Sequence, residues 1–350
     1  MKSKMKIGFW GQLGPETGVA DGQAIKTRII IKESKDRFGE ENVLITNTYK
    51  WNKRPVSFFI HTVKLFYSST KVIILPADNG FRIIVPLYDF LGWICRKPLY
   101  YIVIGGFLTD LLKKSRLYLR MVRKYRALFV ETEGMRKELL DLGVQEVFVL
   151  PNFKPLTPTP LSSIQINNDV HIKLCSFSRI TPEKGIAESI EAVKICNDKL
   201  GENVVSLDFF GLIDPAYYEH FMTSINGLKY CKYKGIVDYL NTVNVIKDYF
   251  CVIFPTYYHG EGFAGIIVDT YFSGVPIIAT DWKYNSDVIV DSVNGFLVPI
   301  KDPDSIADRI IELYNDRKKH YQICYNNLVA AKKYDPESVM DIFYKAIGAS

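Results

Sequence analysis

Cysteine is sparse in this chain and follows no functional spacing. Six cysteines are spread over 350 residues, and no two of them form a Cys-x-x-Cys pair; they are Cys95, Cys175, Cys196, Cys231, Cys251 and Cys324. This pattern argues against a disulfide framework and against a structural zinc site. We therefore interpret these residues as small buried hydrophobes of a protein in a reducing compartment.

Long apolar runs are also missing. The best apolar stretch, Phe81–Cys95, is interrupted by Arg82, Pro86 and Asp89 and is shorter than the roughly 20 residues that a bilayer requires. The first residues, MKSKMKIGFWG, place too few apolar residues after the lysines for a secretory signal. The sequence predicts a cytoplasmic protein, peripheral at most to the inner face of a membrane.

Acidic residues are scarce in the first part of the chain. Residues 1–150 carry 25 Lys and Arg against 14 Asp and Glu, a net charge of +11, whereas the remainder carries 19 against 24, a net charge of −5. The basic half is therefore a candidate to face an anionic surface or substrate. Aromatic residues are plentiful, with 22 Tyr, 21 Phe and 4 Trp, which excludes a disordered chain.

Strand-like apolar runs alternate with helical segments through the first half. The predicted strands are Met5–Trp10, Val43–Thr46, Lys71–Pro76, Leu99–Ile104, Ala127–Glu131 and Glu146–Pro151. The predicted helices include one with periodicity from Ala24, a basic amphipathic one over Phe107–Arg126 and a short one over Glu133–Leu142. Strands that alternate with helices indicate βαβ units and a mostly parallel sheet, hence the α/β class.

The second half repeats this alternation after a proline-rich boundary at Asn152–Ile166. Its predicted helices include Ile186–Leu200 and Ala264–Ser273, and its predicted strands are Lys173–Ser178, Val204–Phe210, Tyr230–Lys234, Tyr249–Pro255, Val275–Thr280 and Gly295–Val298. A length of 350 residues suits two domains. We place the domains at 1–153 and 154–335, with the C-terminal helix 336–350 packing back on the first.

The segment Ser178-Arg179-Ile180-Thr181-Pro182-Glu183-Lys184-Gly185 follows a predicted strand. Thr181 as cap and Pro182 as first residue would open the helix over 186–200. A helix N-terminus flanked by Arg179 and Lys184 concentrates positive potential, so the segment is a candidate diphosphate site. An ordinary capped helix with two solvated cations remains the alternative.

The segment His259-Gly260-Glu261-Gly262-Phe263-Ala264-Gly265, continuing to Asp269, follows another strand. Its glycines allow a ligand to approach the backbone closely. Glu261 and Asp269, eight residues apart, would face a crevice at the carboxyl ends of parallel strands, where open α/β sheets bind ligands. Carboxylates accept hydrogen bonds from vicinal hydroxyls, so a sugar and a ribose are natural ligands. A glycine-rich turn with an incidental helix aspartate is the alternative.

Together these motifs resemble the retaining glycosyltransferases of family 4. The resemblance rests on Arg179, on Glu183-Lys184-Gly185, on Glu261-Gly-Phe, on Asp269 and on Ser273-Gly274-Val275-Pro276. It implies the GT-B fold, in which two Rossmann-like domains face a cleft. It also implies transfer of a sugar from a nucleoside-diphosphate sugar to a glycan or glycolipid acceptor, with retention of anomeric configuration, in surface polysaccharide biosynthesis.

The resemblance assigns roles to individual residues. Arg179 and Lys184 would bind the donor diphosphate, Glu261 would contact the donor sugar, and these three are the predicted catalytic residues. The backbone over Gly262, Phe263, Ala264 and Gly265 would approach the sugar and phosphates, and Asp269, where the family has Glu, would contact the ribose. Gly18 is also a predicted substrate contact, although its loop matches the family's first glycine-rich loop only loosely, and the family's N-terminal histidine has no counterpart at Ile104-Gly105-Gly106.

No catalytic metal or other cofactor is expected, because we interpret the chain as lacking an Asp-x-Asp motif and the resemblance implies metal-independent transfer. A nucleotide-sugar epimerase of the same architecture and a non-catalytic nucleotide-sugar-binding partner subunit are the alternatives to a transferase. A dinucleotide oxidoreductase is disfavoured, since Gly11–Gly18 lacks the GxGxxG spacing.

The basic segment 111–126 is a further feature. It contains seven cations and no acid, interleaved with apolar residues; the cations are Lys113, Lys114, Arg116, Arg120, Arg123, Lys124 and Arg126. We interpret it as a helix that makes peripheral contact with an anionic membrane, where a lipid-linked acceptor would lie. A solvated face beside a core-packed stripe is the alternative, and nucleic acid is excluded because no recognition motif accompanies the charge.

Overall fold

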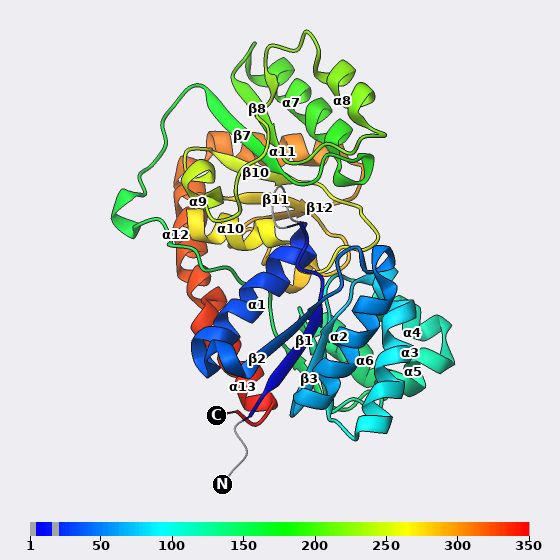
Figure 1. Cartoon of the computed structure of the whole chain (residues 1–350). Coiled ribbons are helices and arrows are strands. Elements are labelled where there is room, and N and C mark those ends of the chain that lie inside the picture. The colour runs from blue at the N-terminus through cyan, green and yellow to red at the C-terminus, as the bar shows by residue number, and fades with distance from the viewer. Residues whose placement is uncertain (1–4, 16–20, 350) are drawn as a thin grey trace. The chain divides into compact units, whose positions relative to one another are not determined.

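The structure is a computed structural model that describes residues 5–15 and 21–349. The chain divides into two compact units (Figure 1). Unit 1 contains the chain up to Lys154 together with the segment from Pro336 onward, and unit 2 contains residues 155–335. None of the helices in the described ranges is long and apolar enough to cross a membrane.

Unit 1 is built on a six-stranded sheet with the order β2-β1-β3-β4-β5-β6, and all its pairs are parallel. The strands lie at or near the predicted runs: β1 (Ile7–Gly11), β2 (Val43–Asn47), β3 (Lys71–Leu75), β4 (Leu99–Ile102), β5 (Ala127–Val130) and β6 (Val147–Val149). Most of their side chains are buried, as expected for a parallel sheet covered on both faces by helices.

Helices connect these strands and cover the sheet. They are α1 (Gly22–Phe38), α2 (Pro55–Ser68), α3 (Asp78–Cys95), α4 (Leu108–Lys114), α5 (Arg116–Val122) and α6 (Glu133–Asp141). The apolar stretch Phe81–Cys95 belongs to α3, a helix that contains Pro86 in its interior. Neither α2 nor α3 was expected from the sequence, because apolar residues such as Phe59 and Trp93 occupy exposed positions, where a periodicity argument expects polar ones.

The predicted continuous helix over Phe107–Arg126 is wrong. The backbone of Ser115 is extended, with φ −135° and ψ 103°, and it separates α4 from α5. Each helix has only seven residues. Because two short helices pack separately, their apolar residues do not form one stripe opposite the cations, as a single amphipathic helix would require.

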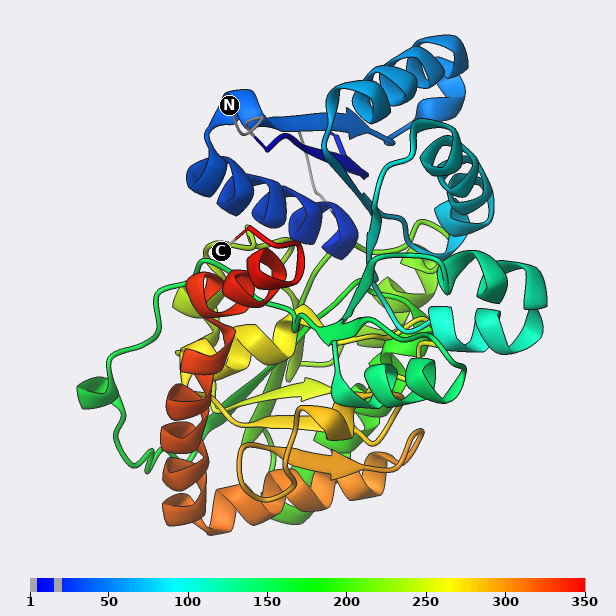
Figure 2. The ribbon, with the colours of Figure 1, turned by 90° about the horizontal axis from the view of Figure 1, so that it is seen from below.

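The last helix of the chain, α13 (Pro336–Ala346), belongs to unit 1. Its Phe343 ring contacts the rings of Phe9 in β1 and Phe129 in β5, with centroids 6.3 and 5.1 Å away. Tyr344 contacts Phe38 at the end of α1 edge to face, at 5.2 Å. Figure 2 shows this helix beside α1. The C-terminal segment thus completes the core of the unit that the N-terminal segment begins.

Unit 2 has a second parallel sheet, with the order β12-β11-β10-β7-β8-β9. Its strands are β7 (Ile172–Phe177), β8 (Val205–Phe210), β9 (Cys231–Tyr233), β10 (Cys251–Phe254), β11 (Ile277–Thr280) and β12 (Phe296–Val298). Its helices are α7 (Ile186–Leu200), α8 (Tyr218–Ile225), α9 (Thr242–Ile246), α10 (Gly265–Ser273), α11 (Pro303–Asn315) and α12 (Arg317–Ala331). The strand order reverses between β7 and β10, so the carboxyl ends of these two strands form a topological switch point.

His320 on α12 is a buried base that links this helix to the sheet. Its ring stacks on Phe250 with centroids 4.0 Å apart, and its Nε2–H donates to the Phe250 carbonyl oxygen at 2.8 Å. The pKa of His320 is lowered from 6.5 to about 4, mainly by burial and also by the nearby Arg317, against the raising effect of the backbone hydrogen bond. Below pH 6.5 the unfolded chain therefore binds a proton at His320, whereas the folded chain binds it only near pH 4.

We expect unit 2 to lose stability as the pH falls from about 6.5 to 4, by up to about 3 kcal/mol from this group. His320→Gln removes the titrating ring and should flatten the curve over that window. The measurement is thermal unfolding at intervals from pH 7 to 4, with the exposed His171→Gln as matched control. An identical pH profile for wild type and His320→Gln would contradict the assignment.

Candidate functional site

The first predicted segment lies where β7 ends and α7 begins. Pro182 does not open α7, as the sequence had suggested: it opens a 3-10 turn over Pro182–Lys184, and α7 starts at Ile186. The side chain of Thr181 makes no capping hydrogen bond there. Gly185 separates the turn from α7, because its φ of +72° is incompatible with a continuous helix.

Gly185 brings this turn against the segment that follows β10. A Cβ atom at Gly185 would lie 2.3 Å from the carbonyl oxygen of Pro255, so only glycine allows this approach. The N–H of Tyr257 donates to the carbonyl oxygen of Glu183 at 2.8 Å and joins the two loops directly. Both loops leave the carboxyl ends of central strands, at the switch point of the sheet.

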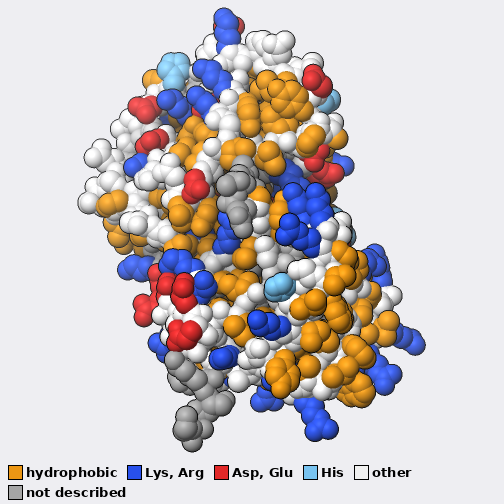
Figure 3. Space-filling model, in the orientation of Figure 1, with side chains coloured by type: hydrophobic (Ala, Val, Ile, Leu, Met, Phe, Trp, Pro, Cys, Tyr) orange, Lys and Arg blue, Asp and Glu red, His pale blue; other side chains and the backbone are white. Residues whose placement is uncertain are grey.

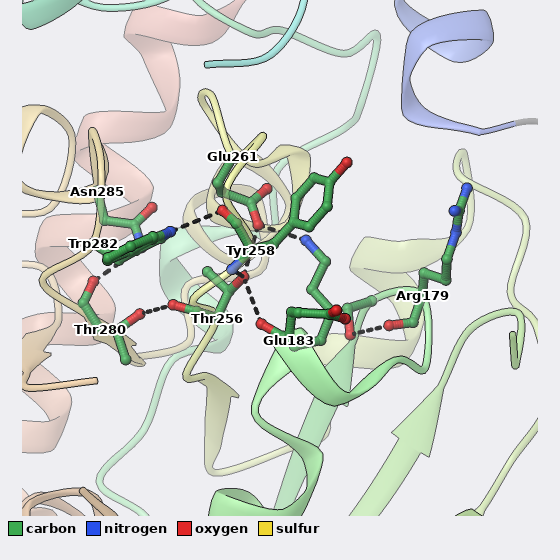
Figure 4. A network of polar contacts seen from close by, with 10 residues as sticks. Arg179, Glu183, Thr256, Tyr258, Glu261, Thr280, Trp282 and Asn285 are labelled. Atoms are coloured by element: carbon green, nitrogen blue, oxygen red, sulfur yellow. Dashed lines mark hydrogen bonds and ion pairs between the residues drawn. The ribbon is translucent and has the colours of Figure 1, made fainter. Parts of the chain in front are cut away.

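The decisive contact across these loops joins Lys184 to Glu261. Lys184 Nζ lies 2.5 Å from Glu261 Oε2, although the residues are 77 positions apart. Their side chains are only 14% and 10% exposed. The Thr256 hydroxyl donates to the same carboxylate oxygen at 2.8 Å. A charge-assisted pair shielded from water and held by a third group is a preorganised polar site (Figure 4).

Aromatic rings complete the surroundings of the ammonium group. Lys184 Nζ lies 4.9 Å from the ring centroid of Tyr258 and 5.4 Å from that of Phe254. Both distances are within the range of a cation–π contact. The lysine is therefore held by a carboxylate and two rings.

A second layer of contacts fixes the loop after β10, and sequence reasoning missed it. The Thr280 hydroxyl donates to the Thr256 carbonyl oxygen, and the Trp282 indole N–H donates to that of Tyr258 at 2.8 Å. Asn285 Nδ2 donates to the Thr280 carbonyl oxygen at 3.0 Å. The sequence did contain a positional signal. Thr280 ends β11 and the other two residues follow it, and the carboxyl end of β11 lies beside that of β10.

Arg179 is not part of this pair. Its side chain is exposed and extends away from Lys184 and Glu261 (Figure 4). Among the described residues, its one hydrogen bond is made by its carbonyl oxygen, which accepts from the Ser178 hydroxyl at 3.0 Å. The structure thus brings together Lys184 and Glu261, two of the three residues predicted as catalytic. The guanidinium group of the third, Arg179, is exposed to solvent.

The N-terminus of α10 lies directly after Glu261. Gly262, Phe263 and Ala264 are buried, and α10 begins at Gly265 without a side-chain cap. The first backbone N–H groups of such a helix have no partner within the helix and attract negative charge. Asp269 lies one turn further on and is only 3% exposed. Gly18, also predicted as a substrate contact, lies outside the described residues.

The premise that the chain lacks an Asp-x-Asp motif is wrong, because Asp302 and Asp304 have this spacing. Asp302 is the N-cap of α11: its carboxylate accepts hydrogen bonds from the backbone N–H and the hydroxyl of Ser305, at 3.0 and 2.6 Å. These bonds hold the pKa of Asp302 below its usual value. Within the described ranges no group of three or more His, Cys, Asp or Glu residues is arranged to hold a metal ion.

Comparison with known proteins finds a family match in the second half of the chain. Residues 163–328 match the family described as glycosyl transferases group 1. The chain contains a glycosyl transferases group 1 domain. The matched region includes the Lys184–Glu261 pair and the N-terminus of α10.

Two curated relatives match over 67% of the chain. One is the poly(ribitol-phosphate) alpha-N-acetylglucosaminyltransferase of Staphylococcus aureus strain COL, 26% identical over 241 residues. The other is the capsular polysaccharide biosynthesis glycosyltransferase CapM of Staphylococcus aureus, 24% identical over 259 residues. The chain spans 46% of the length of the first protein and 66% of the second.

Solved structures of other proteins share this fold. HepE of Anabaena, in complex with UDP-glucose, is 17% identical and has a TM-score of 0.75, with 99% of this chain and 100% of that chain covered. The pneumococcal O-GlcNAc transferase GtfA, in complex with UDP and GlcNAc, has a TM-score of 0.65 at 16% identity, with 83% of this chain and 59% of that chain covered. The predicted α/β class with two parallel-sheet domains is confirmed, and the fold is GT-B.

Proposed function

We propose that this glycosyl transferases group 1 protein is a retaining family 4 hexosyltransferase. It would move a sugar from a nucleoside-diphosphate sugar to a glycan or glycolipid acceptor in surface polysaccharide biosynthesis. The observation that carries the proposal is the Lys184–Glu261 pair beside the uncapped N-terminus of α10. The curated relatives and the UDP complexes of the structural neighbours support it.

The two charges of the pair would act on different parts of the donor. Lys184, with Arg179 from the rim, would neutralise the diphosphate, to which the first N–H groups of α10 would also donate. Glu261 would accept hydrogen bonds from the sugar hydroxyls, and Asp269 would contact the ribose. The backbone over Gly262, Phe263, Ala264 and Gly265 would line the donor.

Donor binding would then exchange partners within the pair. In the structure Glu261 neutralises Lys184 at 2.5 Å. A bound diphosphate would pair with the Lys184 ammonium group in place of Glu261. The Glu261 carboxylate would then accept hydrogen bonds from the sugar hydroxyls. The Thr256 hydroxyl, 2.8 Å from the same oxygen, would keep the carboxylate in place during this exchange.

The chemistry requires no nucleophile from the protein. The acceptor hydroxyl would attack the anomeric carbon from the side on which the bond to the diphosphate oxygen breaks, which retains configuration. Its proton would pass to the departing phosphate oxygen. Lys184 and the N–H groups of α10 would stabilise the charge that grows on that oxygen in the transition state.

The decisive experiment separates the transferase from its alternatives. Nucleoside-diphosphate sugars are first ranked by thermal shift, since a ligand at 100 times its dissociation constant stabilises by about 2.7 kcal/mol. The best donor is then incubated with and without acceptor glycans or glycolipids. Release of nucleoside diphosphate that depends on acceptor supports the proposal. Donor isomerisation without acceptor indicates an epimerase, and binding without turnover indicates a partner subunit.

We expect transfer to proceed without a divalent ion, because Lys184 and the N–H groups of α10 already supply the positive counterpart of the diphosphate. A chelator should leave the initial rate within about twofold of the untreated value. The control is a metal-dependent glycosyltransferase in the same buffer. A rate abolished by chelator and restored by magnesium or manganese would contradict the expectation.

A further inference from the structure

Helix α2 presents apolar side chains to solvent on the side that it does not pack. Val56, Phe59, Ile60, Val63 and Tyr67 recur at helical spacing, and all are exposed, from 38% for Val63 to 83% for Tyr67. The opposite side of α2 buries Thr62, Leu65 and Phe66. A helix that is apolar all round is ordinarily covered on every side.

Helix α3 lies beside α2 and repeats the pattern. Ile83, Phe90, Trp93 and Ile94 are more than half exposed, and Trp93 is 76% exposed. Helix α5 continues the surface on the other side of α3, because Tyr118 packs edge to face on Phe81 and its hydroxyl donates to the Arg82 carbonyl oxygen. We call the exposed surface of α2, α3 and α5 the apolar face. Figure 3 shows a broad hydrophobic area on this part of unit 1.

Cations surround the apolar face and acids are almost absent from it. Lys53 and Arg54 precede α2, Lys64 lies on it, and the sequence has no acidic residue between Glu41 and Asp78. Further exposed cations are Arg82, Arg96, Arg116 and Arg120. Asp89 on α3 is paired with Lys124 at 3.2 Å, so its charge is compensated locally.

We propose that the apolar face docks on an anionic lipid bilayer. Exposed aromatic and aliphatic side chains would enter the boundary between headgroups and acyl chains, and the surrounding cations would meet anionic headgroups. Tyr67 and Trp93, the most exposed side chains of the face, have the amphipathic rings that favour this boundary. The proposal goes beyond the proposed function and does not depend on activity.

The apolar face replaces the segment 111–126 as the source of apolar contact. In that segment Leu112 and Val122 are buried, and Leu117 is its one large apolar residue that is strongly exposed among those the structure describes. The segment therefore contributes cations to the edge of the face. A bilayer fits the face better than a protein partner, because a partner would need an apolar centre within a continuous acidic border.

The test measures co-sedimentation of the full chain with vesicles of 30% phosphatidylglycerol in phosphatidylcholine and with pure phosphatidylcholine vesicles. Wild type should bind the anionic vesicles at least tenfold more tightly, and added salt should weaken that binding. The variant Lys53→Gln/Arg54→Gln/Lys64→Gln should weaken it about 100-fold, since each cation near an anionic surface changes the partition about fivefold. The variant Tyr67→Ser/Trp93→Ser should weaken it at least tenfold.

Matched controls carry the same kinds of change on unit 2. Val170→Ser/Leu240→Ser removes exposed apolar residues, and Lys229→Gln/Lys232→Gln/Lys247→Gln removes three exposed cations. Both controls should bind vesicles as wild type does. All substituted positions are exposed, and an unchanged melting temperature verifies each fold.

Two outcomes would overturn the proposal. The first is equal binding of wild type and both face variants to anionic vesicles. The second is no binding to vesicles together with lipid-free self-association that Tyr67→Ser/Trp93→Ser abolishes in analytical ultracentrifugation, which would assign the face to a second copy of the chain. Loss of vesicle binding with intact acceptor-dependent turnover on a soluble acceptor would uphold docking independently of the catalytic proposal.

Discussion

Lys184→Ala should lower turnover by roughly 10²–10³, with a smaller change in donor KM. The ammonium group would stabilise charge that appears on the leaving diphosphate, so its contribution is greater in the transition state than in the ground state. The structure adds a second cost. Removing Lys184 leaves the Glu261 carboxylate, only 10% exposed, without its cation at 2.5 Å and next to the position proposed for the diphosphate. The bare nucleoside diphosphate should therefore also bind more weakly.

Glu261→Gln should not lower the affinity for the bare nucleoside diphosphate, in contrast to Lys184→Ala. Turnover should fall because the amide is a weaker acceptor for sugar hydroxyls. Affinity for the nucleoside diphosphate should stay equal or rise slightly, because Lys184 loses its competing partner. If Asp269 contacts the ribose, Asp269→Asn should weaken binding of the bare nucleotide and lower turnover by less than Glu261→Gln does.

Calorimetry with the bare nucleoside diphosphate, run beside initial rates, measures both quantities. Lys199→Ala is the matched control, because its ammonium group pairs with Asp308 at 3.1 Å on an exposed surface of the same unit. That variant should keep wild-type rates and affinity. If Glu261→Gln and Lys184→Ala weaken binding of the bare nucleotide equally, the separate roles proposed for the two residues are wrong and the 259–269 loop binds phosphate.

Lys26→Met should destabilise unit 1 by about 3–5 kcal/mol. Lys26 on α1 pairs with Glu131 after β5 at 2.5 Å, and both side chains are only 3% exposed. Removal of the lysine takes away the cation that lies 2.5 Å from a buried carboxylate. The double variant Lys26→Met/Glu131→Leu replaces the pair by apolar side chains, and it should recover much of the loss because it removes the buried carboxylate together with the lysine.

Equilibrium unfolding in urea, followed by tryptophan fluorescence, checks this expectation. Trp10, Trp51 and Trp93 lie in unit 1 and Trp282 in unit 2, so a Trp282→Phe background confines the signal to unit 1. Lys32→Met is the control on the same helix, since its pair with Asp36 is exposed and contributes at most about 0.5 kcal/mol. A loss for Lys26→Met no larger than that of the control would show that the buried pair is not stabilising.

Strong local patterns were enough to predict much of the fold. Buried apolar runs located all twelve strands listed above to within about three residues, because a parallel strand covered on both faces must be apolar throughout its length. The body of helix α7, Ile186–Leu200, was predicted from its apolar periodicity, but its start was placed too early, at Pro182. The helices α2 and α3 were missed because apolar residues such as Phe59 and Trp93 occupy exposed positions, where a periodicity argument expects polar ones.

The candidate site shows the same division between local and non-local information. Residue types and glycines in two short segments sufficed to nominate Lys184 and Glu261, because each loop follows its own strand. That the two side chains meet depends on the order of β7 and β10 in the sheet and on the contact of Gly185 with Pro255. The exposure of the apolar face was equally hidden, since sequence periodicity records which residues are apolar but not which of them the rest of the chain covers. By itself the sequence determined the strands and the chemistry available at their ends. Only the tertiary structure decided which charges pair and which apolar surface stays open, because both depend on contacts between residues far apart along the chain.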